Sequence, residues 1–282
     1  MENSRREEGF FSSISGKSLY YRAWIPESPK WILLISHGLG EHGGRYEHMA
    51  TFFCERGAAV FAPDHLGHGR SEGKRGHVPN FHYFALDLEQ LRVELVSRMP
   101  DLPIVLFGHS MGGAAALDYA LSFQERLTAV ILSAPALGLR MKTPKLQVKA
   151  ADFLARIFPS LTLDNKLSAE WLSHDPQVVE AYRNDPLVHP KISAALFTGM
   201  TAVARQCLQA ADQLKLPVLV IFGGQDPIVS FDAVRSAFEK FSSSDKKLLF
   251  YEKDFHEVHN DLSRMQEFQE IWLWLKDKVN KS

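Results

Sequence analysis

Uninterrupted apolar segments alternate along the chain with segments in which apolar residues recur every three or four positions. The first pattern indicates strands that are buried on both faces, and the second indicates amphipathic helices. The apolar runs predict strands at residues 31–36, 58–63, 104–108, 129–135, 217–223 and 247–252. The helical periodicity predicts helices at residues 45–56, 81–99, 111–122, 231–241 and 267–279.

Strands that alternate with helices are typical of a mostly parallel central sheet flanked by helices, so the pattern predicts an α/β fold. Residues 10–24 precede the alternation and predict a hairpin around a Ser-Gly-Lys turn. The alternation stops between residues 136 and 214, where the pattern is helical and contains no convincing strand. We therefore expect a core of residues 1–135 and 215–282. Residues 136–214 would form a helical cap over the sheet edge where ligands bind.

A single serine stands at the break between one predicted strand and the helix that follows it. The sequence there reads GHSMG, with Ser110 at its centre and glycine two positions away on either side. A serine that merely caps a helix does not require those glycines. A nucleophile on a strained strand-to-helix turn does, because side chains there would collide with neighbouring backbone. The pattern therefore favours Ser110 as a nucleophile.

A serine nucleophile needs a histidine as base and an acid that orients the histidine, and on this architecture they follow the serine in the order acid, then histidine. Asp226 follows the predicted strand at 217–223, although an isolated Asp-Pro pair often only begins a turn. His256 and His259 follow the last predicted strand. Their spacing of three does not match the zinc-protease helix, which needs four, so a metal site is disfavoured.

The loop after the first buried strand contains Gly38, Gly40 and Gly43 in the spacing G-x-G-x-x-G, with Asp64 about twenty residues further on. This spacing also fits a dinucleotide-binding loop, which makes a nicotinamide or flavin oxidoreductase a rival hypothesis. Acyl transfer uses such a loop differently, to aim a backbone N–H at a developing oxyanion. That interpretation assigns the two donors to Leu39 and Met111 and also explains the serine, acid and histidine.

Composition adds limits to these hypotheses. The 282 residues carry a formal net charge of −1, which argues against nucleic acid as a partner because phosphate binding needs clustered basic residues. Two distant cysteines form no disulfide framework, which favours a reducing compartment. The charged N-terminus lacks the apolar stretch of a signal peptide, and no apolar run reaches membrane-spanning length. We expect a cytoplasmic protein, with peripheral membrane contact left open.

Taken together, these motifs resemble those of one family. The chain is similar to the monoglyceride lipase branch of the serine α/β-hydrolases, whose members are also described as lysophospholipases. The matching segments are HGLGEHGGRY at 37–46, DHLGHGRSEGKRGH at 64–77, GHSMGG at 108–113, AYRNDPLVH at 181–189, GGQDPIV at 223–229 and FHEVHND at 255–261. The resemblance extends from about residue 10 to the last predicted helix.

The resemblance implies the α/β-hydrolase fold and a catalytic triad of Ser110, Asp226 and His256, with Leu39 and Met111 as oxyanion donors. It also implies a polar site for the glycerol end of a monoacylglycerol, formed by Glu41, Arg45, Tyr182 and His259. Glu41 and Arg45 are nearly as easily explained as an ion pair that fixes the loop, and Tyr182 as part of the cap interior.

Residues 140–161 combine an apolar helical stripe with Lys142, Lys145, Lys149 and Arg156. A basic amphipathic helix can lie on an anionic membrane surface. We favour a cap helix that buries its apolar face over an acyl pocket, because apolar stripes are usually packed. The two roles are compatible if the cap opens to take a lipid from a membrane.

We therefore expect a serine hydrolase that cleaves esters of single-chain lipids through an acyl-enzyme on Ser110, with monoacylglycerol as the expected substrate and fatty acid and glycerol as products. This chemistry requires neither a metal nor an organic cofactor. Lysophospholipids and short-chain esters are alternative substrates. A hydrolase fold that only binds lipid is an alternative of another class, although a binding module has no need of a triad.

Overall fold

The computed structural model describes residues 4–140 and 145–280, and of residues 145–150 only the backbone. An eight-stranded sheet forms the centre, in the order β1-β2-β4-β3-β5-β6-β9-β10. The first two strands run antiparallel to their neighbours, and the other six are mutually parallel. The strands are β1 (Ser4–Ser12), β2 (Ser18–Pro26), β3 (Trp31–Ser36), β4 (Ala58–Pro63), β5 (Ile104–His109), β6 (Ala129–Ser133), β9 (Val218–Gly223) and β10 (Lys246–Tyr251).

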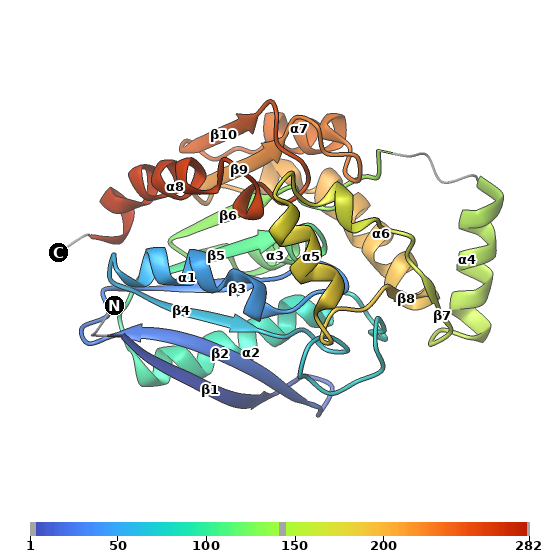
Figure 1. Ribbon diagram of the computed structural model, residues 1–282, viewed down its shortest axis with the longest axis horizontal. Coiled ribbons are helices and arrows are strands. Elements are labelled where there is room, and N and C mark those ends of the chain that lie inside the picture. Colours follow the sequence, from blue (N-terminus) through green and yellow to red (C-terminus); the bar gives the residue numbers. More distant parts are fainter. Residues whose placement is uncertain (1–3, 141–144, 281–282) are drawn as a thin grey trace.

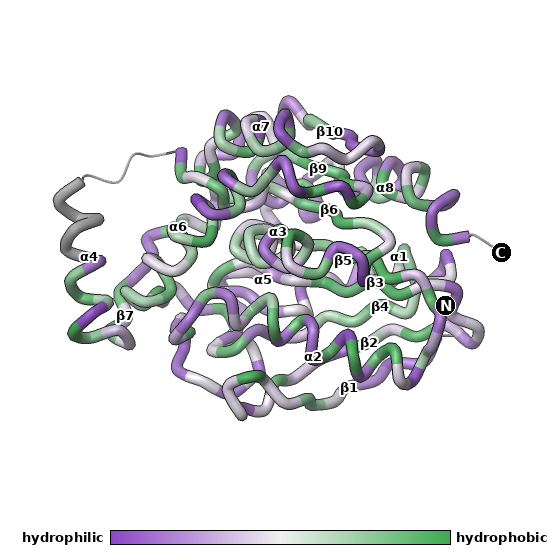
Figure 2. Tube along the Cα trace, turned by 180° about the vertical axis from the view of Figure 1, so that it is seen from behind, coloured by the Kyte–Doolittle hydropathy of each residue, from purple (hydrophilic) through white to green (hydrophobic). Residues whose placement is uncertain are grey.

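Helices cover both faces of this sheet (Figure 1). One layer contains α1 (Glu47–Cys54) and α8 (Arg264–Val279), and the opposite layer contains α2 (Tyr83–Arg98), α3 (Met111–Phe123) and α7 (Phe231–Lys240). Successive strand residues point to opposite faces, so each buried strand contributes to both layers. In β3, for example, Leu33 and Ile35 pack with α1 and α8, whereas Ile32 and Leu34 pack on the other side. The inner strands are accordingly the hydrophobic centre of the chain trace in Figure 2.

The predicted core elements are confirmed, most of them to within one or two residues. Gly57 has a φ of +84° and ends the segment after α1, as expected of a glycine in the left-handed region. The hairpin is longer than expected, because β1 begins at Ser4 and pairs with β2 along its whole length. Residues 4–9 are mostly polar and lie on the edge of the sheet, where strands carry little hydrophobic signal.

The segment between β6 and β9 forms a cap beyond the carboxyl ends of the parallel strands. It contains α4 (Lys145–Ile157), α5 (Pro176–Asn184) and α6 (Ala194–Gln209). The expectation that it holds no strand is wrong, because β7 (Thr162–Asp164) and β8 (Lys191–Ser193) form a small antiparallel sheet. These strands are too short for an alternation to be recognised. The exact division of the chain at residues 136 and 214 stays a prediction.

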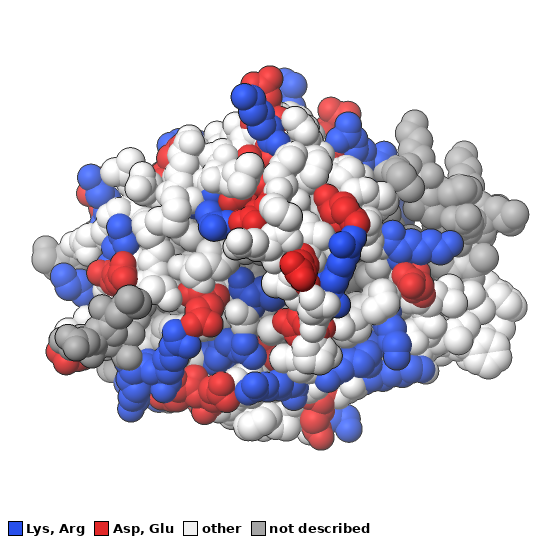
Figure 3. Space-filling model, viewed as in Figure 1, with Lys and Arg blue, Asp and Glu red and all other residues white. Residues whose placement is uncertain are grey.

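One-turn 3-10 helices complete the chain, namely η1 (Gly43–Tyr46), η2 (Gln124–Arg126), η3 (Ala169–Trp171), η4 (Ala211–Gln213) and η5 (Val258–Asn260). No helix in the described residues is long and apolar enough to cross a membrane. On the face drawn in Figure 3, positive and negative side chains are interspersed rather than gathered by sign. That distribution agrees with the near-zero net charge of the sequence.

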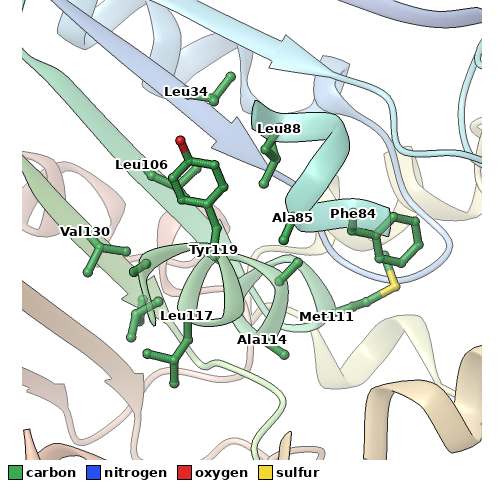
Figure 4. Packing of buried hydrophobic residues seen from close by; sticks show 14 of the residues in the cluster. Leu34, Phe84, Ala85, Leu88, Leu106, Met111, Ala114, Leu117, Tyr119 and Val130 are labelled. Carbon is green, nitrogen blue, oxygen red and sulfur yellow. The ribbon is translucent and has the colours of Figure 1, made fainter. Parts of the chain in front are cut away.

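Helix α3 lies at the centre of one layer, directly after the break that contains the candidate nucleophile. Figure 4 shows Leu117 and Tyr119 of this helix among side chains of the sheet and of α2, including Leu106 and Leu88. The hydroxyl of Tyr119 donates a hydrogen bond of 2.6 Å to Glu89, so its polar end is satisfied inside the layer. Close packing on several sides fixes the first turn of α3 against the sheet.

One buried acid interrupts the apolar face of α8. Glu267 is fully buried, and neither of its carboxylate oxygens has a hydrogen-bond partner. Burial, together with the nearby carboxylates of Asp254 and Glu270, raises the pKa of Glu267 well above its ordinary value of 4.5. The folded state therefore favours the protonated, neutral form of this side chain more strongly than the unfolded chain does.

We expect Glu267→Gln to remove a pH-dependent loss of stability. The folded protein keeps a proton that the unfolded chain releases. The contribution of the neutral acid to the free energy of unfolding is therefore complete below pH 4.5 and is lost as the pH rises through the raised pKa of Glu267. The loss is at most about 1.4 kcal/mol per pH unit. Denaturant unfolding between pH 4 and 9 should show the variant gaining stability over the wild type as the pH rises.

Asp277→Asn on the exposed side of α8 is the matched control and should show a constant difference from the wild type across this range. A Glu267→Gln difference that is also independent of pH would mean that Glu267 titrates normally in the folded protein.

Candidate active site

Ser110 sits on a sharp turn between β5 and α3. It has a φ of +54° and a ψ of −117°, which is a strained conformation for a residue with a side chain. A Cβ atom at Gly108 would overlap the carbonyl oxygen of Gly112, and one at Gly112 would overlap the carbonyl oxygen of Ser36. Both glycines are therefore required for this close approach of helix and sheet, as the sequence pattern predicts.

Asp226 and His256 come together at the carboxyl ends of β9 and β10. The ring Nδ1 of His256 lies 2.7 Å from Asp226 Oδ2, and both side chains are buried. The other carboxylate oxygen of Asp226 accepts the backbone N–H groups of Ile228 and Val229 at 2.7 and 3.0 Å. These bonds fix the carboxylate, which in turn fixes the imidazole orientation.

Burial alone would lower the pKa of His256. The charge and the hydrogen bond of Asp226, together with the charges of Glu257 and Glu41, outweigh burial and raise that pKa above 6.5. The neighbouring ring of His109 lies 4.7 Å away between ring centres, and its pKa is well below the ordinary value, mainly through burial. Of these two adjacent imidazoles, His256 is thus the one that takes up a proton readily. This is the property that a general base needs.

The described residues show no hydrogen bond between Ser110 Oγ and the His256 ring; such bonds often form only when substrate is present. The pocket beside Ser110 is also lined by Leu39 and Met111. In the described part of the chain, neither of their backbone N–H groups has a hydrogen-bond acceptor. Two unused donors near the serine are what an oxyanion hole requires.

A buried ion cluster lies directly behind the glycine loop. Arg45 contacts Glu41 at 2.6 Å and holds both carboxylate oxygens of Glu257 at 2.6 and 2.7 Å. Glu41 also accepts the backbone N–H of Gly38 at 2.5 Å and the hydroxyl of Tyr46 at 2.8 Å. The cluster therefore joins the loop that carries Leu39 to the loop that carries His256.

The two carboxyl groups of this cluster are in different electrostatic situations. Burial would raise the pKa of Glu257, but the bidentate Arg45 guanidinium outweighs it and lowers that pKa to about 2. The pKa of Glu41 is raised, first by burial and then by the charge of Glu257. Arg45 is the main group that stabilises the charged form of Glu41, and the hydrogen bonds from Gly38 and Tyr46 add to it.

Two further residues expected at a glycerol site lie beside this cluster. The ring of Tyr182 from α5 covers the Arg45 guanidinium at 4.7 Å. His259 is fully buried, and its ring stacks on Tyr46 at 4.9 Å. Burial lowers the pKa of His259 to about 3, and neither ring nitrogen has a partner. The structure thus gathers all four residues in one region, with His259 behind the others.

The acids and histidines of this region form one close set. Glu41, His109 and Glu257 place ligand-type atoms within 4.8 Å of one another. The Arg45 guanidinium bonds to both carboxylates and already supplies positive charge there. A metal ion would have to displace this buried arginine, so the set fits an internal ion cluster better than a metal centre.

The glycine loop is also explained without a dinucleotide. Asp64, which the rival hypothesis would place on a ribose, is fully buried. Its two oxygens accept the backbone N–H groups of Gly43 and Arg70, both at 2.8 Å. A Cβ atom at Gly43 would clash with Ala62, so this glycine serves the packing of the loop on β4. Asp64 has no free oxygen with which to bind a ribose.

An apolar cavity of about 360 Å³ opens beside Ser110 and extends under the cap. The core contributes Leu39, Met111, Ala136, Leu139, Ile228 and Val229, and the cap contributes Leu154, Leu163, Ile192, Phe197 and Met200, among others. A chain-shaped apolar group attached to Ser110 would be shielded from water here. Only the segment Asp164, Asn165 and Lys166 brings a run of polar residues to this wall.

Sequence reasoning gave no role to two residues of this site. Glu257 directly follows His256, but its bond to Arg45 joins residues 212 positions apart, so adjacency in sequence gives no hint of it. Asn165 lies in a turn after β7, where polar residues are ordinary. The sequence shows only that Asn165 belongs to the predicted cap. It does not show which part of the core that segment of the cap faces.

The sheet order, the strained serine turn and the Asp226–His256 pair define a serine α/β-hydrolase arrangement. Comparison with known proteins agrees. The chain belongs to the monoglyceride lipase family of α/β-hydrolases, and residues 27–263 match the family model described as "Serine aminopeptidase, S33". It is similar to the monoacylglycerol lipase of Mycolicibacterium smegmatis, with 32% identity over 98% of this chain and 99% of that protein.

Two further relatives bear on the substrate. The chain is 31% identical to phospholipase YtpA of Bacillus subtilis, over 87% of this chain and 95% of that protein. The crystal structure of Paleococcus ferrophilus monoacylglycerol lipase is 33% identical and has a TM-score of 0.85, covering 92% of this chain and 99% of that one. The predicted family and fold class are thereby confirmed.

The pair of Asp226 and His256 gives a prediction that needs no substrate. NMR titration of the imidazole protons should show His256 taking up its proton above pH 6.5, while His259 stays neutral through the same range. In Asp226→Asn, the His256 midpoint should fall, because the charge that stabilises the imidazolium is gone. An unchanged midpoint in this variant would show that Asp226 does not control the base.

Proposed function

We propose that the protein hydrolyses esters of single-chain lipids, with monoacylglycerol as the substrate and fatty acid and glycerol as products. The observation that carries the proposal is the position of Ser110, between an apolar cavity on one side and a buried polar cluster on the other. An ester with one apolar and one polar arm matches that arrangement. The similarity to monoacylglycerol lipases supports the same substrate class.

In the proposed reaction, Ser110 Oγ attacks the ester carbonyl carbon while His256 Nε2 accepts the hydroxyl proton. Asp226 holds the Nδ1–H and stabilises the imidazolium. The N–H groups of Leu39 and Met111 donate to the oxyanion. The departing glycerol oxygen takes the proton from His256, leaving an acyl-serine. Water then attacks the acyl carbon and gives its proton to His256, and the serine oxygen recovers a proton as the fatty acid leaves.

The polar arm is assigned to Glu41, Arg45, Tyr182 and His259. Arg45 already bonds to Glu41 and to Glu257, and Glu41 also accepts a hydrogen bond from the loop at Gly38. We therefore assign Arg45 and Glu41 chiefly to shaping this site. Tyr182 is half-buried and lines the second cavity, and its hydroxyl has no hydrogen bond among the described residues, so we assign that hydroxyl to glycerol. His259 would not contact glycerol directly; it would support the site through its ring, which stacks on Tyr46.

A lysophospholipid is the second candidate substrate, supported by the similarity to the Bacillus phospholipase. Its phosphate would need a cation near the alcohol site. Arg45 is buried and is bridged between two carboxylates, so it has little capacity for a third anion. This arrangement favours the uncharged glycerol ester.

We expect Ser110→Ala to lower fatty acid release from monoacylglycerol by at least about 10³-fold, since no other group replaces the nucleophile. The variant should also lose labelling by a fluorophosphonate probe. Ser122→Ala, on the exposed side of the same helix, is the matched control and should behave as wild type. Release should be measured alongside lysophosphatidylcholine and a short aryl ester.

Aryl ester hydrolysis alone would retain the triad but reject the lipid assignment. Absence of both labelling and turnover in the wild type would favour a protein that only binds lipid. Copurification of a nicotinamide or flavin with the protein would revive the oxidoreductase hypothesis.

We further propose that the cap contacts a membrane surface from which the lipid is drawn. Phe153 and Ile157 of α4 and Leu163 of β7 are 61%, 51% and 61% exposed, and Phe158 follows directly after α4. Figure 1 shows α4 standing away from the body of the molecule. Lys142 of the predicted basic set lies outside the described residues, and only the backbone is described at Lys145 and Lys149.

Replacing Phe153 and Phe158 together by serine should weaken binding to anionic lipid vesicles by at least about tenfold, because each phenylalanine contributes roughly 1.5–3 kcal/mol when fully buried. Activity on a soluble aryl ester should be unchanged. Phe10→Ser removes an equally exposed ring on β1, away from the cap, and is the control. Equal vesicle binding by all three proteins would reject the proposed contact.

A further inference from the structure

Asn165 occupies a wall shared by two cavities. One is the apolar cavity beside Ser110, and the other, of about 450 Å³, lies within the cap and is lined by Tyr182 and Asp185 among others. Among the residues that the structure describes, Asn165 and Leu167 alone line both. Because Leu167 is apolar, Asn165 supplies the side-chain hydrogen-bonding groups of this shared wall in the described part of the chain.

The backbone and one side-chain atom of Asn165 are firmly held. Its backbone N–H donates to the carbonyl oxygen of Pro190 at 2.6 Å, across the β7–β8 ladder. Its Oδ1 accepts the backbone N–H of Leu167 at 2.9 Å. These two bonds fix the χ angles of the side chain and direct the remaining amide nitrogen away from the turn.

That remaining atom, Nδ2, is buried and has no hydrogen-bond partner among the described residues. A methyl group built at Gly40 would lie 3.8 Å from it, so the amide faces the loop that carries Leu39. A buried donor without an acceptor destabilises the free protein, and this cost is removed when an oxygen atom of a ligand reaches the donor. Nδ2 is therefore an unsatisfied donor on the residue that separates the two cavities.

We propose that Asn165 Nδ2 donates a hydrogen bond to a hydroxyl of the glyceryl group while the acyl chain occupies the apolar cavity. This inference rests on the proposed function and deepens it, because it identifies a determinant of preference for polyol esters over simple alkyl esters. The apolar cavity takes the acyl arm, and we place the alcohol arm toward Asn165, which also lines the second cavity together with Tyr182. An alkyl ester such as a methyl ester has no hydroxyl to place there.

The test compares kcat/KM for a monoacylglycerol and for the methyl ester of the same fatty acid, in the wild type, Asn165→Asp and Asn165→Ala. Asn165→Asp keeps the acceptor for Leu167 but removes the donor, so the turn is retained. In both variants we expect a loss of about 3–10-fold on the monoacylglycerol with the methyl ester within twofold of wild type, since one neutral hydrogen bond is removed. Asn184→Ala, on an exposed cap position, is the matched control and should change neither value.

Each outcome separates the two proposals. Equal losses on both esters would assign Asn165 a structural role, and wild-type kcat/KM on both esters would show that no hydroxyl binds it; either result overturns this inference alone. If the wild type releases no fatty acid from monoacylglycerol, the proposed function fails, and this inference fails with it.

Discussion

The close contact between the start of α3 and the ends of β3 and β5 is the constraint on which the site depends. The Ser110 conformation costs of the order of 1–3 kcal/mol, and it persists because α3 is packed between the sheet, α2 and α6. Gly112 is the point of closest approach, against the carbonyl oxygens of Ser36 and His37. The same approach presents the oxyanion loop, which follows His37, to the serine. One steric condition thus places nucleophile and oxyanion donor together.

A second requirement is that the loops after β3 and β10 keep a fixed distance from each other. The buried Arg45 holds the two loops at this distance by ion pairing, because its guanidinium bridges Glu41 of one loop and Glu257 of the other. Buried ion pairs add little net stability, but removing one partner leaves an uncompensated charge and typically costs about 3–5 kcal/mol. The pair is therefore better understood as a geometric link between Gly38 and His256 than as a source of stability.

Much of this was predictable, for identifiable reasons. The inner strands were predicted almost residue by residue, because a strand buried on both faces carries an unbroken apolar run. Ser110 and Asp226 were predictable since each follows such a strand, and His256 since it follows the last apolar segment, although its strand β10 is a partly buried edge strand. Glu257 and Glu267 were not, because nothing local distinguishes a buried carboxylate from a solvated one. The strands β7 and β8 were also missed, because three residues are too few to show a period and their pairing depends on tertiary contacts.

The cap and the core meet through the backbone of the two catalytic loops. His189 donates its N–H to the carbonyl oxygen of Gly40 at 2.9 Å, and Glu257 donates its N–H to that of Leu172 at 2.8 Å. Any displacement of the cap is therefore transmitted to residues adjacent to Leu39 and His256. A cap that opens for a lipid would loosen the oxyanion donor and the base, and a cap closed over the acyl chain would restore both.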